Sequence, residues 1–293
     1  MIQEKIGKGS YQAKAKLADK AFRVLALTFT VLALLILATL IIDIFSKGLG
    51  RLNWGFFRNL PSRHAEQAGI LTALAGMISL IFFTILIALP VGILAGVYLE
   101  EYGKRNRFAK FIEINIANLA GVPSVIYGIL GLTIFVRLAG LGNSLIAGAL
   151  TLALLILPII IVATREAVKA VPASLREASY GMGATKWQTT SRVVIPSAMG
   201  GILTGIILSI SRAVGETAPL LVIGALVYVP FIPEGPHDQF TTLPIQVFNW
   251  ISRPQAAFMV NAAAGIIVLL LITFLLNGIA IYIRNQWYKK IKY

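Results

Sequence analysis

The sequence predicts an all-α polytopic membrane protein with six transmembrane helices. Of its 293 residues, 57% are hydrophobic and only 13% are charged, and the mean hydropathy is +0.82. Soluble globular domains carry about a quarter charged residues, so this composition excludes a water-soluble enzyme, a disordered tail and a fibrous repeat. Apolar stretches long enough to cross a hydrocarbon core of about 30 Å recur along the chain, separated by polar segments.

Six apolar segments bounded by charged residues account for the predicted helices. Each has about 19 residues or more, enough to cross the bilayer at 1.5 Å per residue. The first is too long for the apolar region of a cleavable signal peptide, so we expect it to remain as a helix. The predicted spans are residues 24–42, 68–99, 114–136, 141–164, 197–228 and 256–283.

The basic residues predict the orientation of these spans, with both termini cytoplasmic. In that orientation 19 of the 26 Lys and Arg residues lie inside and 6 lie outside, and the remaining one is within the fifth span. Cytoplasmic loops of membrane proteins carry an excess of Lys and Arg. The net charge of +14 is therefore a topology signal, and we expect no nucleic-acid partner. The absence of cysteine excludes disulfides and thiolate metal sites but does not identify the compartment.

The predicted organisation has three parts. Residues 1–67 contain a basic N-terminus, the first span and an extracytoplasmic loop, residues 68–283 form a five-helix core, and residues 284–293 form a basic cytoplasmic tail. Prolines in the second, third and fourth spans are expected to kink their helices, because proline removes a backbone donor. Either these prolines only shape the bundle, or they are hinges of helices that rearrange as a pathway opens on alternate sides. They are Pro90, Pro123 and Pro158.

The cytoplasmic segment 165–196 is too long for a tight turn and is patterned as two short helices. Pro172 suits a first helical position, and the nearby Gly183 can supply the left-handed residue that ends a helix. Thr185 and Gln188 have the spacing of a capping box, which predicts the start of a second helix. An exposed pair of helices with mixed charges and apolar residues predicts a docking surface for another protein. We assign Arg176, Glu177 and Lys186 to that surface.

This segment resembles the EAA loop of ATP-binding-cassette importer permeases, whose pattern is E-A-A, three residues, G, nine residues, I-x-L-P. The matching elements are Glu177-Ala178-Ser179, Gly183 and Val193-x-Ile195-Pro196, with conservative departures at positions 179, 193 and 195. The resemblance implies a type I importer (MetI-like) fold and a coupling helix that sits in a cleft on a separate ATPase subunit. The alternative is a solvated loop without a partner. The residues expected in ATPase coupling are Glu177, Ala178, Gly183, Thr185, Trp187 and Pro196.

Two charges lie near the middle of the fifth span. Arg212 and Glu216 are four residues apart, which places them on one helix face and within reach of each other. A charge in the bilayer core is costly, so it is expected to face the bundle interior or a water-filled cavity. The pair either fixes helix packing or places Arg212 on the route of an anion, because guanidinium donors suit a tetrahedral oxyanion.

Several sequence segments resemble the PstA family of bacterial phosphate permeases, which favours the interpretation that Arg212 lies on the route of an anion. The segments are RAVGETAPL from Arg212, YGMGATKWQT from Tyr180, VPSVIYG from Val122 and FTTLPIQVFNWISRP from Phe240. The resemblance covers about residues 68–283 and assigns the family's intramembrane arginine to Arg212, with Glu216 in the same run. It implies phosphate transport in the bacterial cytoplasmic (inner) membrane. It also implies a PstC-like partner permease, two PstB-like ATPase subunits and a PstS-like phosphate-binding protein outside.

The sequence also limits what the chain does alone. It contains no G-x-x-x-x-G-K-[ST] phosphate loop, so we expect no ATPase site, no cofactor and no enzymatic activity in this subunit. His64 and His237 lack ligand-spaced neighbours and are expected to be surface residues rather than metal ligands. Another oxyanion such as sulfate, phosphonate or molybdate stays open as the substrate, as does an autonomous ion-coupled transporter. A membrane-embedded enzyme is disfavoured because Glu216 is the only acidic residue in the predicted spans.

A short amphipathic helix is also predicted within residues 240–251, on the outer surface. Two roles are open for it. The first is functional: the helix covers the pathway or meets a binding protein. The second is structural: the helix anchors the chain at the membrane interface through Trp250.

Overall fold

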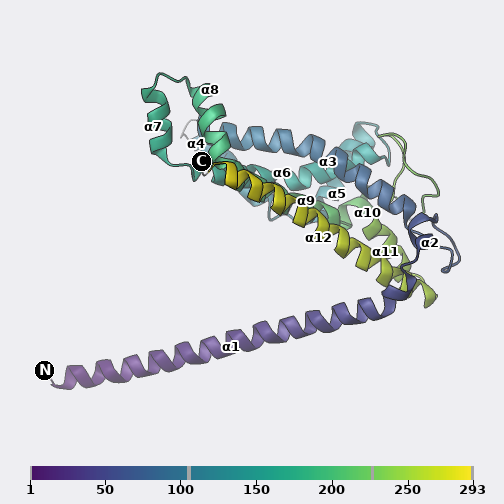
Figure 1. The fold of residues 1–293 in the computed structure, drawn as a ribbon, viewed down its shortest axis with the longest axis horizontal. Coiled ribbons are helices and arrows are strands. Elements are labelled where there is room, and N and C mark those ends of the chain that lie inside the picture. Colours follow the sequence, from purple (N-terminus) through teal and green to yellow (C-terminus); the bar gives the residue numbers. More distant parts are fainter. Residues whose placement is uncertain (1, 104–106, 226–227, 292–293) are drawn as a thin grey trace.

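The computed structural model describes residues 2–103, 107–225 and 228–291, and within these ranges every regular element is helical (Figure 1). The first and last residues of the predicted terminal parts therefore lie outside the described residues. The elements are α1 (Ile2–Gly48), η1 (Leu49–Arg51), α2 (Trp54–Arg58), α3 (Leu71–Val97), η2 (Tyr98–Tyr102), α4 (Arg107–Leu119), α5 (Ser124–Gly131), η3 (Leu132–Leu138), α6 (Leu145–Lys169), α7 (Ala173–Gly181), α8 (Lys186–Thr189), η4 (Thr190–Val194), α9 (Ile195–Gly215), α10 (Ala218–Val222), α11 (Leu243–Ile251) and α12 (Ala257–Ile291). η1 is a 3₁₀ turn, and η2, η3 and η4 are π-helical turns.

Five of the six predicted spans each contain one long apolar helix, although in the fifth span that helix ends before the span does. Within the described residues, five helices are long and apolar enough to cross a membrane, and they contain α1, α3, α6, α9 and α12. The third predicted span is instead a pair of helices, Lys110–Leu119 and Ser124–Leu138, bent by 101°. Pro123 is the N-cap of α5 at this break. The kink expected at Pro123 is therefore present as a sharp break, and the third predicted span corresponds to this bent pair.

The core is built from α3, α6 and α9, with α6 the most buried of the spanning helices. Glycines allow the backbones to approach closely: a Cβ on Gly92 of α3 would lie 2.6 Å from Ile160 of α6. A Cβ on Gly205 of α9 would collide with Ala163 of α6. Close backbone approach through small residues is the usual way that helices associate in lipid. The α3–α6 pair is therefore a tightly packed unit.

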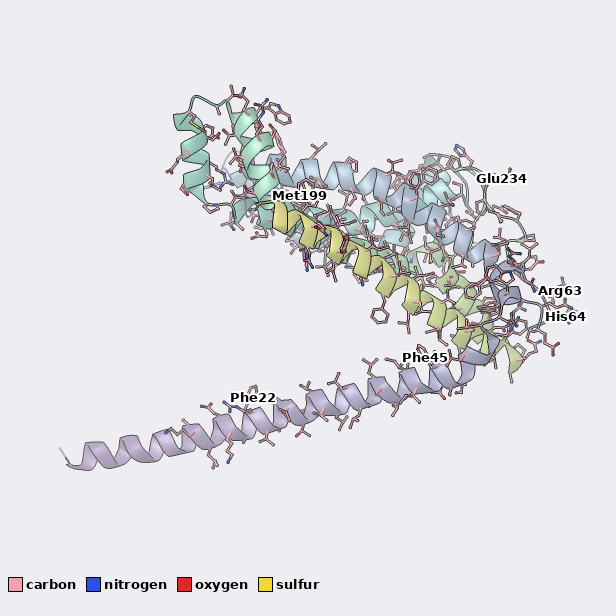
Figure 2. All side chains as sticks on the ribbon, in the orientation of Figure 1. Phe22, Phe45, Arg63, His64, Met199 and Glu234 are labelled. Atoms are coloured by element: carbon pink, nitrogen blue, oxygen red, sulfur yellow. The ribbon has the colours of Figure 1, made fainter. Side chains whose placement is uncertain are left out.

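α1 joins two of the parts expected within residues 1–67. The basic N-terminus and the first span form one helix of 47 residues. Its C-terminal end contacts α12, and the rest of the helix extends away from the bundle (Figure 1). None of the apolar window of this helix is buried within the chain, and Figure 2 shows Phe22 far from the other helices. Lipid or another chain must therefore cover α1.

The fifth predicted span is also interrupted. α9 ends at Gly215, Glu216 has extended backbone angles (φ −73°, ψ 127°), and α10 begins at Ala218. The prediction of one helix over 197–228 is wrong because Pro219 lacks an amide donor and its ring would clash with the carbonyl of Gly215 in a continuous helix. Pro90 and Pro158, in contrast, lie inside helices that continue past them.

The C-terminal part of the chain brings one more correction, at Trp250. The predicted tail 284–293 continues α12 as a helix to Ile291. α11 is helical as predicted, but Trp250 is fully buried, 5.9 Å between ring centroids from Phe56. An interfacial anchoring role for Trp250 is therefore wrong. His64 and His237 are exposed in loops, as predicted, and Figure 2 places His64 at the end of the molecule opposite α7.

Candidate transport pathway and coupling surface

Arg212 lies at the level of the middle of α6. α9 and α6 run antiparallel, and Gly205 is in contact with Ala163. Moving seven residues up α9 corresponds to moving seven residues back along α6, so Arg212 is level with Ile156. The neighbouring Ala213 shares a buried cluster with Ile156. Because α6 spans Leu145–Lys169, this level is close to its centre, as the position in the predicted span indicated.

Arg212 and Glu216 form one weak contact. The Arg212 Nε donates to Glu216 Oε1 at 3.4 Å, and the side chains are 36% and 15% exposed. The predicted pairing is thus present, but the two residues do not share a continuous helix. Glu216 caps the C-terminus of α9 in an extended conformation. The backbone of Glu216 therefore lies outside the regular hydrogen bonding of α9.

The Arg212 side chain belongs to a partly exposed face of α9, here called the uncovered stripe, whose edges meet α6 at Gly201 and α12 at Thr204. Its members recur every three or four residues, the spacing of one helix face, and each is exposed or half-buried within this chain. Leu208, one turn from Arg212, is 61% exposed. The stripe consists of Ser197, Gly201, Thr204, Leu208, Arg212 and Gly215.

Further polar groups lie along the contact of α9 with α12, and the sequence analysis did not select them. Ser211 hydrogen bonds to Asn277, and the Arg284 Nη1 donates to the Thr204 Oγ1 at 3.4 Å. The sequence signal was Asn277 within an apolar run of α12. These residues make the neighbourhood of Arg212 more polar than the two predicted charges alone.

Two interrupted spans meet beside Arg212. α5 follows the break at Pro123, α10 follows the break at Glu216, and they pack so closely that a Cβ on Gly128 would lie 2.8 Å from Pro219. Tyr127 is buried there, and its hydroxyl donates to the carbonyl of Leu119 across the break at 2.8 Å. Discontinuous helices that meet near the membrane midplane are a common construction of substrate sites in transporters.

The cytoplasmic segment 165–196 folds largely as predicted. It contains α7 and α8, and Gly183 adopts the left-handed conformation with φ +82°. The capping box is present: the Gln188 amide donates to Thr185 Oγ1 at 3.3 Å, and the Thr185 amide donates to Gln188 Oε1 at 2.8 Å. Pro172 is the N-cap rather than the first helical residue. Pro196 lies in a helix that runs without a break from α8 through η4 into α9.

The outer surface of α7 and α8 combines charge with exposed apolar side chains. Glu177, Ala178, Gly183 and Thr185 are exposed, and Trp187 is 65% exposed. The structure adds two apolar residues that the sequence analysis did not select, Leu175 at 42% and Met182 at 83% exposure. An exposed apolar patch rimmed by polar residues is typical of a protein interaction site.

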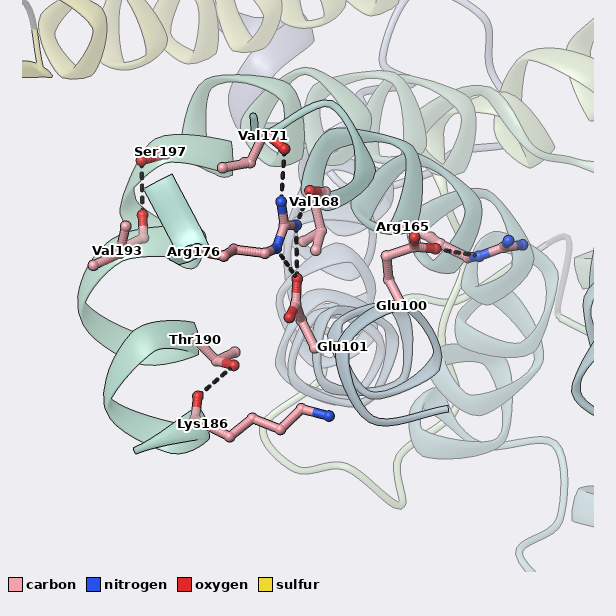
Figure 3. Close-up of polar contacts among 10 residues, drawn as sticks. All are labelled: Glu100, Glu101, Arg165, Val168, Val171, Arg176, Lys186, Thr190, Val193 and Ser197. Atoms are coloured by element: carbon pink, nitrogen blue, oxygen red, sulfur yellow. Dashed lines mark hydrogen bonds and ion pairs between the residues drawn. The ribbon is translucent and has the colours of Figure 1, made fainter. Parts of the chain in front are cut away.

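Arg176 does not belong to this surface, which corrects the prediction. Its guanidinium points inward and binds Glu101 at the cytoplasmic end of α3 (Figure 3). Lys186 also has an inward partner, with its Nζ 4.7 Å from the centre of the Tyr102 ring. The docking surface predicted from the sequence therefore keeps Glu177 but loses Arg176.

Comparison with known proteins identifies the class to which this architecture belongs. Residues 88–287 match the family described as binding-protein-dependent transport system inner membrane component. The chain belongs to this family of multi-pass permease subunits of ATP-binding-cassette transporters, which are not catalytic subunits.

Individual relatives narrow the assignment within this class. The chain is 33% identical over 270 residues to the phosphate transport system permease protein PstA of Yersinia pestis, covering 92% of this chain and 90% of the relative. It is 35% identical over 225 residues to PstA 1 of Mycobacterium tuberculosis strain H37Rv, covering 77% and 72%. It is also 32% identical over 274 residues to the probable ABC transporter permease protein YqgI of Bacillus subtilis, covering 87% and 92%.

Solved structures agree on the fold. The methionine ABC transporter MetNI in an inward-facing conformation contains a chain with a TM-score of 0.56 and 21% identity, with 75% of this chain and 94% of that chain covered. A bacterial alginate ABC transporter, in complex with a periplasmic protein bound to alginate pentasaccharide, contains a chain with a TM-score of 0.67 and 13% identity, with 89% and 93% covered. At these identities the similarity establishes the MetI-like importer permease fold alone.

Proposed function

We propose that this chain is the permease subunit of an ATP-driven phosphate importer and forms half of the translocation pathway by alternating access. The observation that carries the proposal is the position of Arg212, level with the middle of α6 and on the uncovered stripe of α9. Relatives named as phosphate transport system permeases cover most of the chain and support phosphate over sulfate, phosphonate or molybdate.

The Arg212–Glu216 pair has the chemistry needed for transient anion contact. Phosphate near neutral pH carries one or two negative charges, so the pathway must replace part of its hydration without holding it tightly. Glu216 neutralises Arg212 while the site is empty, because an unpaired charge in low dielectric is costly. When phosphate arrives, the single 3.4 Å contact is exchanged for stronger bonds from the guanidinium to phosphate oxygens.

The energy enters through the cytoplasmic segment. The surface of α7 and α8 docks on a PstB-like ATPase subunit, which hydrolyses ATP, and two such subunits serve the complete transporter. A PstC-like permease of the same fold supplies the other half of the pathway, and a PstS-like protein delivers phosphate from outside. The complex lies in the bacterial inner membrane with both termini of this chain cytoplasmic. The coupling residues are Glu177, Ala178, Gly183, Thr185 and Trp187 on the docking segment, with Pro196 at the start of α9.

Among the three predicted hinges, Pro123 fits the hinge role best. It lies at the 101° break next to α5, so a small change in its backbone angles redirects the helix that packs on α10. Pro90 and Pro158 lie inside α3 and α6, where they shape the helices.

The proposal is tested by uptake of labelled phosphate at low external concentration. Cells that lack the gene are complemented with the wild type, Arg212→Gln or Arg137→Gln at matched membrane abundance; Arg137 is an exposed arginine at the opposite end of η3 from α5. We expect the wild type and Arg137→Gln to restore uptake and Arg212→Gln to abolish it. If Arg212→Gln also restores it, Arg212 is structural. If the wild type fails with phosphate but restores uptake of labelled sulfate, the substrate assignment is wrong.

A further inference from the structure

A cluster of charged side chains surrounds η2, the π-helical turn at the cytoplasmic end of α3, far from Arg212. Three consecutive residues of this turn reach three different elements: Glu100 pairs with α6, Glu101 with α7, and Tyr102 with α8. Figure 3 shows the two carboxylates pointing to arginines on opposite sides of the turn. We call this group the η2 cluster; its members are Glu100, Glu101, Tyr102, Glu113, Arg165, Arg176 and Lys186.

The strongest contact of the η2 cluster joins η2 to the coupling helix α7. The Arg176 Nε and Nη2 donate to the same oxygen of Glu101 at 3.0 and 2.7 Å. Two further N–H donors bind the carbonyl of Val168, within the last turn of α6, at 2.9 Å and the carbonyl of Val171, just beyond it, at 2.6 Å. The Glu101 side chain is only 7% exposed. One guanidinium therefore ties α7 to α3 and to the end of α6 at once.

The other contacts of the η2 cluster extend the link to α4 and α8. Arg165 of α6 donates to Glu100 at 3.0 Å and pairs with Glu113 of α4 at 2.7 Å. The ammonium of Lys186, the first residue of α8, lies 4.7 Å from the centre of the Tyr102 ring. A displacement of α7 or α8 would therefore pull on charged contacts that involve α3, α4 and α6.

The backbone conformation of η2 depends on Gly103. The Gly103 amide donates to the Tyr98 carbonyl at 2.8 Å, which closes the π-helical turn. A Cβ at this position would collide with the carbonyl of Leu99. η2 follows α3 without a break, and α3 is packed against α6 through Gly92 and Gly96. A force on η2 therefore acts on a stiff pair of membrane helices.

We propose that the η2 cluster transmits the displacement of the coupling helices α7 and α8 to the membrane helices, with Glu101 and Arg176 as the positioning pair that carries it. This inference rests on the proposed function in requiring an ATPase that moves α7, and it does not depend on phosphate as the substrate. Within the described residues, Arg176 is the side chain of α7 that hydrogen bonds to η2. The other polar side-chain contact of α7 is between Ser179 and Thr189, within the coupling segment itself.

The test uses the complete transporter reconstituted in vesicles, with the partner permease, the ATPase and the binding protein. Uptake and ATP hydrolysis are measured in the same vesicles for Arg176→Gln, Glu101→Gln, the double variant and Arg176→Lys. Glu166→Gln is the matched control, because its pair with Lys169 is exposed and 3.9 Å long. ATPase content is measured by co-purification.

We expect the single variants to retain the ATPase but to transport at least tenfold less substrate per ATP hydrolysed. The double variant is expected to be no worse than either single variant, because both remove the same link. Arg176→Lys keeps the positive charge but not the planar set of guanidinium donors, and it is expected to recover part of the transport per ATP hydrolysed. The control is expected to match the wild type.

An unchanged ratio of uptake to hydrolysis in Arg176→Gln overturns the proposal, including the case in which some ATPase dissociates but the intact complexes keep the wild-type ratio. That result means that Arg176 only anchors α7. The phosphate assignment fails separately, in wild-type vesicles that take up no phosphate. The ratio is then measured with the oxyanion that the wild type transports.

Discussion

Two arginine–glutamate pairs, one level with the middle of α6 and one at the end of α3, are built in opposite ways. Arg212 makes one contact to Glu216 at 3.4 Å, and its side chain is 36% exposed. Arg176 binds Glu101 twice, at 2.7 and 3.0 Å, and two carbonyls as well. Glu101 is almost completely buried, and its carboxylate belongs to a helical turn, whereas Glu216 follows a helix end.

The difference indicates what each pair is able to do. A guanidinium has five N–H donors. Within the described residues, Arg176 makes four hydrogen bonds through its Nε and both terminal nitrogens, which leaves one N–H of Nη1, whereas Arg212 makes one bond through its Nε. The Arg212–Glu216 pair is therefore suited to exchange a partner for an anion, and the Arg176–Glu101 pair is suited to hold two elements together.

The largest predicted difference is in stability. Arg176→Met leaves the Glu101 carboxylate buried without its partner, which costs about 3–5 kcal/mol. Arg212→Met removes a single 3.4 Å contact and leaves Glu216, which is 15% exposed, without its partner, so the expected loss is smaller, about 1–3 kcal/mol. Thermal unfolding of the purified complexes measures both. Equal losses for the two variants would contradict the contrast between the pairs.

A smaller effect separates two glycines, one next to each pair. Gly103→Ala places a Cβ against the Leu99 carbonyl and distorts η2, with an expected cost of about 1–3 kcal/mol. Gly215→Ala adds a methyl group where no atom lies within 4 Å, so it is expected to be neutral or slightly stabilising. The same unfolding measurement distinguishes them. A Gly103→Ala protein as stable as the wild type would show that η2 is not rigid.

The smallest predicted difference concerns two helix caps. Thr185 caps α8 with its side chain, and Thr185→Ala is expected to cost about 1 kcal/mol locally. Thr217, the N-cap of α10 beside Arg212, makes no such bond to its helix, so Thr217→Ala is expected to change little. Hydrogen exchange of the α8 and α10 amides measures the local effect. Faster exchange in α10 than in α8 after the respective substitutions would reverse the expected order.

The sequence predicted the features that depend on local chemistry. Apolar length identified five continuous spans, and the T-x-x-Q spacing identified the capping box at Thr185. The four-residue spacing of Arg212 and Glu216 indicated their pairing, which the structure contains. The break between them was missed, although Pro219 carries its signal, because an apolar run was treated as one helix.

Features that depend on distant contacts were not predictable from one sequence. Arg176 occurs in an exposed segment and was assigned to the docking surface, but its partner Glu101 lies 75 residues away. Trp250 is similar, since its burial follows from packing on Phe56 of α2. In both cases the residue type fits a surface role, and tertiary packing alone decides the outcome.

The most direct test of the central claim, that the uncovered stripe of α9 lines the phosphate pathway, uses the absence of native cysteine. Leu208→Cys places a thiol on the stripe, and Ser209→Cys places one at a fully buried neighbour. Each variant of the complete transporter is treated with a membrane-impermeant, negatively charged thiol reagent, with and without phosphate. The account predicts that Leu208→Cys reacts, that phosphate slows the reaction, and that Ser209→Cys does not react. A Leu208→Cys protein that is unreactive, or that reacts at the same rate with phosphate present, would contradict it.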